Sequence, residues 1–462
     1  MTWRDYLVLL LHIGAELEHC LMVEYLYAAY SLGGDQVPKD AKTQDMVRRW
    51  RDQILSIARE EMGHLLTVQN VLCLLGGPVT FDREDFPWDT VFYPFPFCLE
   101  PLTLDSLACY VYAEMPPFAQ LEKEIRKSDA AEFKKAAAQI RKSVIRRVPG
   151  RQTHPVGEVY ERIIKLIADP TVISDSDFHA DSVRFQASWD DWGRSYQPAP
   201  QRPDGTEPRG AKHASHLIIA RMGTRTEAVA ALKAVAGQGE APQFRPPESE
   251  EQSHFARFAT IYREFEKLRE SKQRWQPARN LAVNPTTMAV DYAPDDATPI
   301  EATTTKTWAN LFNLRYRILL AYLTHSYRLA RDDDHPTQPG PRGAILHKVF
   351  GEMYNLKTIA GVLVDLPLGK RGSSKRAGPP FEMPYTVELP LLDIDCWRQH
   401  RENLTNSLHL CEVLLTEKSN RPGAAPNISE DYLKTLRELD QQSIDWIDQI
   451  LTGLVRNQEI RS

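Results

Sequence analysis

Two Glu-x-x-His pairs, each in a stretch with helical character, constrain this chain more than any other feature. Glu61 and His64 lie three residues apart within a long helical run, and Glu251 and His254 repeat the spacing at the start of another. Residues three apart are close to one turn apart in an α-helix, so both side chains leave the same face. One such pair is weak evidence, but two suggest a helix bundle in which each pair has a counterpart around a metal site.

The first predicted helix places an acid on an otherwise apolar face. It runs from about residue 4 to residue 31, and apolar side chains recur along it at spacings of three and four. Glu18 lies on this stripe, whereas Glu16 and Glu24 lie off it and are expected to be solvated. Glu18 is therefore a candidate ligand that faces the inside of the bundle.

The second predicted helix runs from about Thr43 to Leu75. At 1.5 Å per residue it would span about 50 Å, which suits a bundle helix. Glu61 and His64 are the strong polar groups on its inner face, whose residues are Ile54, Ile57, Ala58, Glu61, His64, Leu65, Val68 and Leu72. An unpaired acid and imidazole would be costly to bury there, and a shared cation removes that cost.

Single acids on other helices complete the candidate ligand set. The expected pattern is one Glu from each of two helices and one Glu-x-x-His from each of two others. Glu18 fills one single position, and spacing does not choose between Glu114 and Glu158 for the second. Glu240 is a weaker extra candidate. The candidate metal ligands are therefore Glu18, Glu61, His64, Glu114, Glu158, Glu251 and His254.

Other histidines and several tyrosines have simpler explanations. A lone histidine is more often a surface or hydrogen-bonded core residue, which is our interpretation of His12, His19, His216, His325, His347 and His409. Five tyrosines could line a redox site, but aromatic packing explains them better: Tyr25, Tyr27, Tyr30, Tyr110 and Tyr112.

Composition argues against several other classes of protein. The 56 basic and 62 acidic residues give a net charge of −6, which leaves no basic excess for nucleic acid. The six cysteines form no C-x-x-C, so neither a disulfide framework nor a structural zinc site is indicated, and a reducing cytosol is expected. The N-terminal apolar run is short and is soon followed by Glu16 and Glu18. It predicts an amphipathic helix rather than a signal peptide or membrane span, and we expect no other apolar run to cross a bilayer.

The chain is predicted to be all-α and to contain two regions. Residues 273–305 combine Pro, Asn, Asp and Thr with little periodicity, which favours a boundary there. Residues 1–280 would form the metal-binding bundle. Residues 281–462 would form a second helical region that packs on it, with helices at about 308–331, 344–364, 393–417 and 429–455.

Short motifs in the first region carry a family resemblance. They include Arg-Glu-Glu-Met-Gly-His (59–64), Leu-Gly-Gly-Pro (75–78), Ala-Glu-Met-Pro (113–116), Val-Gly-Glu-Val-Tyr-Glu (156–161), Gly-Gln-Gly-Glu (237–240) and Ser-His-Phe-Ala-Arg-Phe (253–258). Together they resemble the ferritin-like domain of iminophenylpyruvate dimer synthases, which couple two imines of an aromatic 2-oxo acid in violacein- and rebeccamycin-type pathways. The resemblance covers residues 4 to 270 and continues more loosely through 377–382.

This resemblance implies a ferritin-like four-helix bundle with long loops that holds two iron ions, with manganese as an alternative. It also implies dioxygen as co-substrate and a small, amino-acid-derived substrate in specialised metabolism. We expect an oxidase or oxygenase. The alternatives are oxidative coupling of the dimer-synthase type and iron binding or storage without a substrate. Neither nucleic acid nor membrane is an expected partner, and a homodimer is left open.

Overall fold

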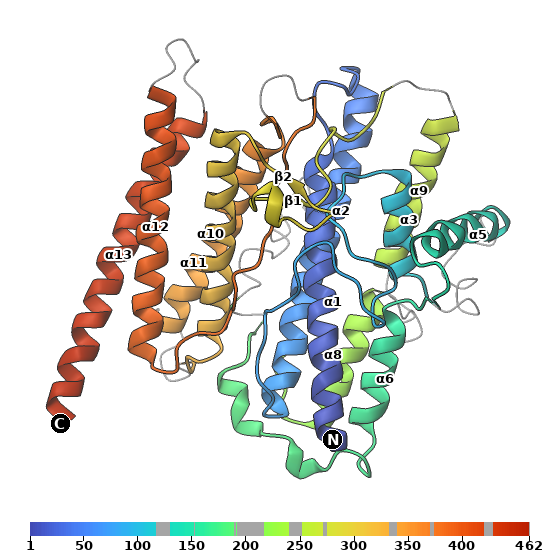
Figure 1. Cartoon of the computed structure of the whole chain (residues 1–462). Helices are drawn as coiled ribbons and strands as arrows, with labels where there is room; N and C mark the ends of the chain where they lie inside the picture. Colours follow the sequence, from blue (N-terminus) through green and yellow to red (C-terminus); the bar gives the residue numbers. More distant parts are fainter. Residues whose placement is uncertain are drawn as a thin grey trace, which may run out of the picture. The chain divides into compact units, whose positions relative to one another are not determined.

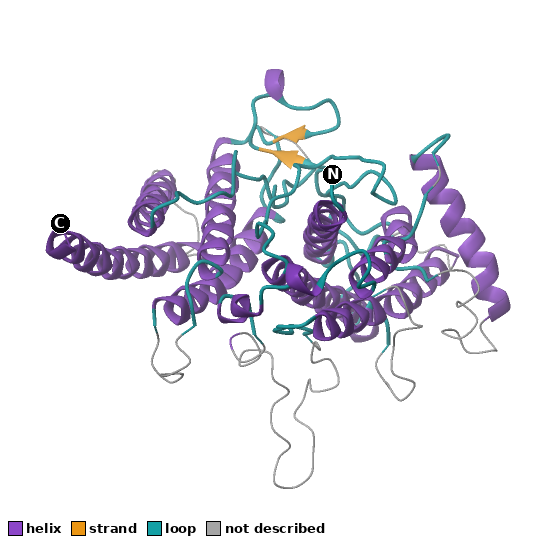
Figure 2. Cartoon of the chain, turned by 90° about the horizontal axis from the view of Figure 1, so that it is seen from below, coloured by secondary structure: helices purple, strands orange, loops and turns teal. Residues whose placement is uncertain are grey.

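The computed structural model describes residues 1–116, 130–151, 153–188, 191, 217–239, 252–270, 275–331, 340–369, 374–419 and 428–461. The predicted all-α class is confirmed, since helices supply nearly all regular structure in these ranges (Figures 1 and 2). The strands described are β1 (Pro285–Thr286) and β2 (Thr298–Pro299), which pair in parallel. The chain divides into two compact units, Met1–Arg279 and Asn280–Ser462.

The bundle of the first unit has four helix positions. Continuous helices fill two of them, and each of the other two is divided between shorter helices. Its elements are α1 (Trp3–Ser31), α2 (Ala41–Leu74), α3 (Leu104–Ala113), α5 (Ala130–Arg147), α6 (Gly157–Ala168), η1 (Asp175–Asp177), η2 (Ala180–Arg184), α8 (Arg225–Gln238) and α9 (His254–Glu270). Helices α1 and α2 lie side by side, while α3 packs on α9 and α6 packs on α8 (Figure 1). A backbone hydrogen bond of 3.1 Å from Val156 to Ala113 joins the end of α3 to the start of α6. The predicted four-helix bundle is confirmed, with two of its positions divided.

Side-chain caps fix where the helices of the bundle begin. Thr2 and Asp5 form a capping box at α1, with hydrogen bonds of 3.0 and 3.1 Å. Ser253 caps α9, because its hydroxyl accepts a hydrogen bond of 3.2 Å from the amide of Ala256. Helix α9 therefore begins at His254.

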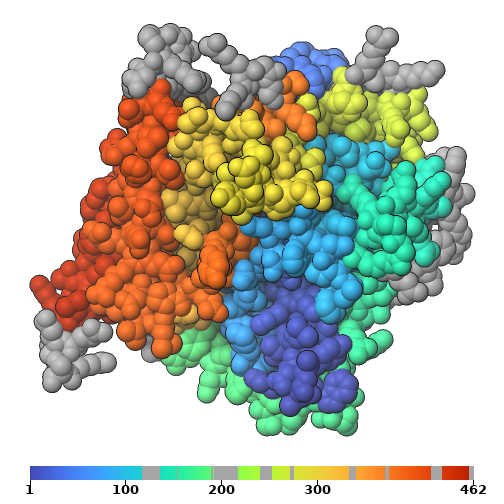
Figure 3. Space-filling view, viewed as in Figure 1, coloured from blue at the N-terminus to red at the C-terminus, as the bar shows by residue number. Residues whose placement is uncertain are grey.

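An aromatic-rich segment, residues 79–101, lies over α1 and covers acids that the sequence placed in solvent. Its light-blue atoms lie over the middle of α1 in the space-filling view (Figure 3). Glu24 is 2% exposed, and its Oε1 accepts a hydrogen bond of 2.5 Å from the amide of Cys98. Burial raises the pKa of Glu24 well above its usual value. The expectation that Glu24 is solvated was wrong, because helix periodicity does not reveal a loop that covers the helix. Glu16, the other acid expected in solvent, is half-buried.

Helix α1 is apolar along most of its length. Among the residues that the structure describes, it is the one helix long and apolar enough to cross a membrane by those two criteria. Judged by length and composition alone, the expectation that no apolar run could cross a bilayer is therefore wrong. Within the bundle, 67% of the apolar window is buried, as in the core helix of a helical domain.

The second unit is a separate set of antiparallel helices. They are α10 (Thr303–Ser326), α11 (Pro341–Leu363), α12 (Asp393–Ser419) and α13 (Ile428–Arg461), preceded by the 3-10 turn η6 (Val290–Tyr292). Helix α10 packs on α11 and α12, and α12 packs on α13. That the region is helical is confirmed, while its packing on the bundle stays a prediction.

Candidate metal centre

Buried carboxylates and imidazoles gather where the helices of the first unit meet. Glu18 comes from the middle of α1, and Glu61 and His64 come from the middle of α2. Glu114 is the residue that ends α3, and His254 is the first residue of α9. None of the five side chains is more than 2% exposed. Four separate helices therefore contribute polar groups to one enclosed space.

Glu61 lies between two similar halves of this cluster. Its Oε2 is 2.8 Å from Nδ1 of His64, and its Oε1 is 2.9 Å from Nδ1 of His254. Glu18 Oε2 lies 3.4 Å from the same nitrogen of His64, and Glu114 Oε2 lies 3.6 Å from that of His254. The imidazole rings stack with centroids 5.3 Å apart. Ligand atoms of Glu61, His64 and His254 all lie within 4.8 Å of one another.

Several atoms that face this space lie within ion-pair distance of one another but make no hydrogen bond. Within the described part of the chain they are Glu18 Oε2, Glu61 Oε1, Glu114 Oε2 and His254 Nδ1. Buried polar atoms without hydrogen bonds are costly, so four of them in one place favour a common partner. All four atoms can donate a lone pair. The donor set therefore fits cations such as iron or manganese, and Glu61, which reaches both histidines, could contribute a ligand in either half.

Tyrosine hydroxyls hold the outward oxygens of the two flanking carboxylates. Tyr160 of α6 donates a hydrogen bond to Glu18 Oε1, and Tyr25 of α1 donates one of 2.5 Å to Glu114 Oε1. The remaining oxygen of each acid is thereby left to face the centre. Tyr25 packs in the core as expected, 5.0 Å from the ring of Tyr110, but it also orients a candidate ligand.

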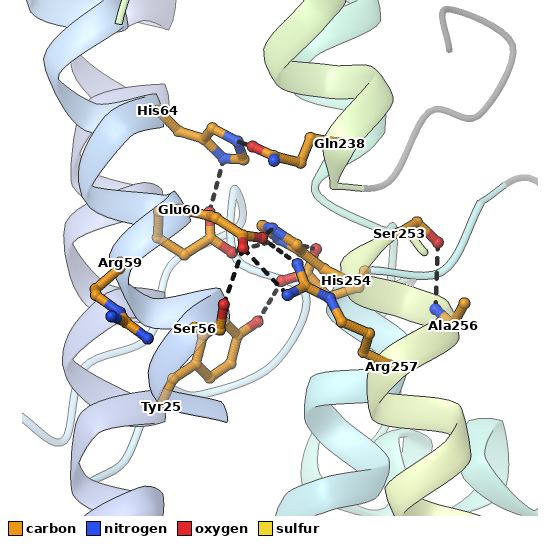
Figure 4. A network of polar contacts seen from close by, with 12 residues as sticks. Tyr25, Ser56, Arg59, Glu60, His64, Gln238, Ser253, His254, Ala256 and Arg257 are labelled. Carbon is orange, nitrogen blue, oxygen red and sulfur yellow. Dashed lines mark hydrogen bonds and ion pairs between the residues drawn. The ribbon is translucent and has the colours of Figure 1, made fainter. Parts of the chain in front are cut away.

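The outer nitrogens of the two histidines have different partners (Figure 4). His64 Nε2 lies 3.0 Å from the amide oxygen of Gln238, which is neutral. His254 Nε2 lies 2.8 Å from Glu60 Oε2, and Arg257 binds that carboxylate in turn. A donating Nε2–H leaves the Nδ1 lone pair of each ring facing the centre, which is the form that binds a metal.

Charges within the cluster shift its pKa values in opposite directions. Burial and the charge of Glu61 raise the pKa of Glu18 to about 8 and also raise that of Glu114. Burial opposes charge on His64 and His254, but the facing carboxylates outweigh it and hold both pKa values well above the usual range. Those imidazoles in turn hold the pKa of Glu61 well below its usual value despite its burial. Protons on the imidazoles thus balance the acids, and a bound cation would displace them.

The structure brings five of the candidate ligands together and leaves one apart. Glu18, Glu61, His64, Glu114 and His254 form the cluster. Glu158 does not join it, because it is exposed in the first turn of α6, where an acid favours the positive end of the helix dipole. Glu240, Glu251 and His216 lie outside the described residues.

Sequence reasoning missed the residues behind the ligands, namely Glu60, Gln238, Tyr160 and Arg257. Glu60 adjoins Glu61, and the periodicity of an amphipathic helix places it outside the inner face, so sequence reasoning did not identify it. However, every residue of α2 from Glu60 to Leu72 is buried. The available signal was the low charge of that stretch after Glu61, which is typical of a helix surrounded on all sides.

The fold and the cluster define an all-α bundle protein with a buried carboxylate–imidazole site that could hold metal ions. A family model described as ferritin-like matches residues 11–263, more than half of the chain. The chain therefore belongs to the ferritin-like family. No solved structure matches the chain.

Two curated relatives confirm the resemblance predicted from the motifs. Dichlorochromopyrrolate synthase of Lentzea aerocolonigenes is 24% identical over 423 residues, which cover 83% of this chain and 36% of that protein. The 2-imino-3-(indol-3-yl)propanoate dimerase of Chromobacterium violaceum is 35% identical over 130 residues, which cover 23% of this chain and 12% of that protein. The chain thus spans little more than a third of the length of the first relative.

Proposed function

We propose that this protein is a di-iron oxidase or oxygenase that uses dioxygen to oxidise a small, amino-acid-derived molecule. The observation that supports the proposal best is the convergence of four buried ligand atoms that make no hydrogen bond, from Glu18, Glu61, Glu114 and His254, on one enclosed space. Three carboxylates and two imidazoles suit iron or manganese.

Each half of the centre would hold one ion. Glu18 and His64 would bind the first, Glu114 and His254 the second, and Glu61 would reach both. Iron held by these residues would supply the redox chemistry that activates dioxygen.

The surrounding residues keep these ligands in place. The hydroxyls of Tyr25 and Tyr160 fix the two flanking carboxylates, while Gln238 and Glu60 fix the histidine tautomers. The nearly complete burial of the ligands excludes bulk water, which protects reactive species from side reactions.

The relatives support a substrate derived from an amino acid. One of them is named as a dimerase of 2-imino-3-(indol-3-yl)propanoate, an imino acid that carries an indole ring. By analogy, oxidation of an aromatic imino or amino acid in natural-product biosynthesis is the reaction class we propose. Oxidative coupling of two such molecules is the alternative within the same class.

Metal analysis tests the proposal directly. We expect roughly two irons per chain in full-length protein loaded anaerobically with ferrous iron, as the paired ligand pattern requires. Replacing His64 and His254 together by Ala should abolish tight binding, because each half loses its nitrogen ligand. The matched control replaces His12 and His154, two histidines of the same unit that bond to backbone carbonyls away from the centre.

Loss of iron in the His64→Ala/His254→Ala variant, with retention in the control, supports the centre. No tight iron or manganese binding under any loading condition would contradict it. Oxygen consumption by the iron-loaded protein then separates an enzyme from an iron store, since only an enzyme consumes oxygen faster when its substrate is added. A panel of aromatic 2-oxo, amino and imino acids provides the candidate substrates.

A further inference from the structure

The two halves of the centre present the same kinds of donor atom. Glu18 Oε2 lies 3.4 Å from Nδ1 of His64, and Glu61 adds an oxygen 2.8 Å from that nitrogen. Glu114 Oε2 lies 3.6 Å from Nδ1 of His254, and the other oxygen of Glu61 lies 2.9 Å from it. A tyrosine hydroxyl holds the outward oxygen of each flanking acid. Among the described residues, a chemical difference between the halves therefore comes from the groups behind the histidines.

The group behind His64 is neutral. Gln238 is the last residue of α8 and is 8% exposed. Its amide oxygen lies 3.0 Å from Nε2 of His64 and carries no net charge (Figure 4). His64 can therefore bind a metal through Nδ1 as an ordinary neutral imidazole.

The group behind His254 is a carboxylate. Glu60 is buried, and its Oε2 lies 2.8 Å from Nε2 of His254 (Figure 4). Its Oε1 accepts hydrogen bonds of 3.1 Å from Arg257 and 3.2 Å from Ser56, which hold the carboxylate in place. The positive charge of Arg257 favours its ionised form. A carboxylate that accepts from the outer N–H raises the basicity of the nitrogen that binds the metal.

Building on the proposed di-iron function, we propose that the two metal positions are inequivalent and that the His254 half fills first. Gln238 is the positioning residue that makes the difference, because its neutral amide orients His64 without raising the basicity of the ring. The partner of a ligating histidine commonly changes metal affinity by about 10–100-fold. We therefore expect the affinities of the two positions to differ by at least about tenfold.

Stepwise loading of the full-length protein with cobalt(II) shows which half fills first, without turnover. A histidine that binds cobalt through Nδ1 keeps its Nε2–H, which gives a strongly shifted proton NMR signal that disappears in heavy water. We expect the signal of His254 with the first equivalent of cobalt and the signal of His64 with the second. Glu60→Gln should shift the first signal and Gln238→Glu the second, which assigns both.

The identity of the half that fills first decides the question, and the number of binding steps does not. Repulsion between neighbouring cations also separates the filling of two equal halves. Equal halves would give both histidine signals in equal amounts after the first equivalent, and that result overturns the proposal. A first signal from His64 overturns it as well.

Exchanging the partners of the two histidines tests the role of Gln238. In Gln238→Glu the weaker cobalt affinity, measured by competition with a chelator, should rise by about tenfold, because His64 then also donates to a carboxylate. In the double variant Gln238→Glu/Glu60→Gln the order of filling should reverse. Gln186→Glu is the matched control, since it adds the same charge at a buried glutamine of the first unit whose amide bonds to the backbone of Met222. An unchanged weaker affinity in Gln238→Glu, or an equal rise in the control, overturns the role of Gln238.

The NMR measurement on the unaltered protein, with Glu60→Gln for assignment, stays decisive if Gln238→Glu does not fold. Binding of fewer than two cobalt ions overturns both this proposal and the proposed function. Two bound cobalt ions, together with an iron form that oxidises no substrate, contradict only the proposed function.

Discussion

Glu60 gives one histidine of the centre a charged partner and leaves the other with a neutral one. Although burial opposes ionisation, hydrogen bonds and charge from His254 and Arg257 lower the pKa of Glu60 to about 2. The carboxylate therefore stays ionised at neutral pH. A histidine whose outer N–H donates to a carboxylate binds metal more strongly than one that donates to an amide. We infer that Glu60 acts on the centre through His254.

Replacing Glu60 with Gln tests this role by removing charge while keeping shape. We expect metal affinity to fall by about 10–100-fold, the usual effect of losing the partner of a ligating histidine. The measurement is competition with a chelator of known affinity for cobalt(II) at pH 7. Glu24→Gln is the control, because Glu24 is equally buried in the bundle but bonds to the amide of Cys98 and touches no ligand. Similar losses in both variants would point to general destabilisation instead.

Helix periodicity was enough to predict the bundle and part of its ligand set. The stripe on α2 that contains Glu61 and His64 is buried throughout, and Glu18 faces the same space from α1. Both predictions rest on long, continuous helices, for which the spacing of apolar residues defines the inner face. The same reasoning could not find Glu60, because α2 is enclosed on every side at that level and has no outer face.

Helix ends were harder to predict, because tertiary packing decides them. Glu114 and Glu158 are both single acids near a helix end, but the first ends α3 inside the bundle and the second begins α6 in solvent. Ser253 caps α9, whose first residue is His254, and Glu251 lies outside the described residues. The periodicity of the sequence also gives no sign that two of the four bundle positions are each divided into separate helices.

In the second unit two buried histidines, His325 of α10 and His400 of α12, are hydrogen-bonded to each other. His325 Nε2 lies 2.8 Å from Asp393 Oδ1, and His325 Nδ1 lies 2.9 Å from His400 Nε2. Burial and the neighbouring His325 lower the pKa of His400 from 6.5 to about 3. Burial also lowers the pKa of His325, although Asp393 opposes the shift. Both rings are therefore neutral in the folded protein at neutral pH.

The lowered pKa of His400 predicts that α12 is sensitive to acid. Below pH 6.5 the unfolded state binds a proton at His400 that the folded state refuses until about pH 3. Stability is thus present above pH 6.5 and is lost as the pH falls, by up to about 1.4 kcal/mol per unit. Hydrogen exchange of the α12 amides, corrected for intrinsic rates, should give an opening free energy that falls between pH 7 and pH 5.

Substitution locates the titrating group. His400→Phe should flatten this pH dependence while keeping an aromatic ring beside Tyr322. His409→Phe on the same helix should leave it unchanged, because His409 is exposed. An unaltered slope in His400→Phe would show that other groups cause the acid sensitivity.

Across the whole molecule, each unit is built around its own buried charged cluster. In the second unit the guanidinium of Arg315 lies at the centre, bonded to Glu352 at 2.6 Å, to Asp440 at 2.8 Å and to Ser407 at 3.1 Å. These residues come from α10, α11, α13 and α12 respectively. Periodicity predicted four helices here but not this network, because Arg315 falls on a face whose other residues are apolar.

Removing Arg315 should therefore affect the second unit and spare the metal centre. Arg315→Leu leaves Glu352 and Asp440 buried without their cation, and we expect the free energy of unfolding to fall by about 3–5 kcal/mol. The exposed pair of Arg401 and Asp448 supplies the control, since Arg401→Leu should cost less than about 1 kcal/mol. Urea unfolding gives both values, and hydrogen exchange assigns the loss to α10–α13. Metal content should stay unchanged, because every clustered ligand belongs to the first unit, and a parallel loss of metal would show that the units are energetically coupled.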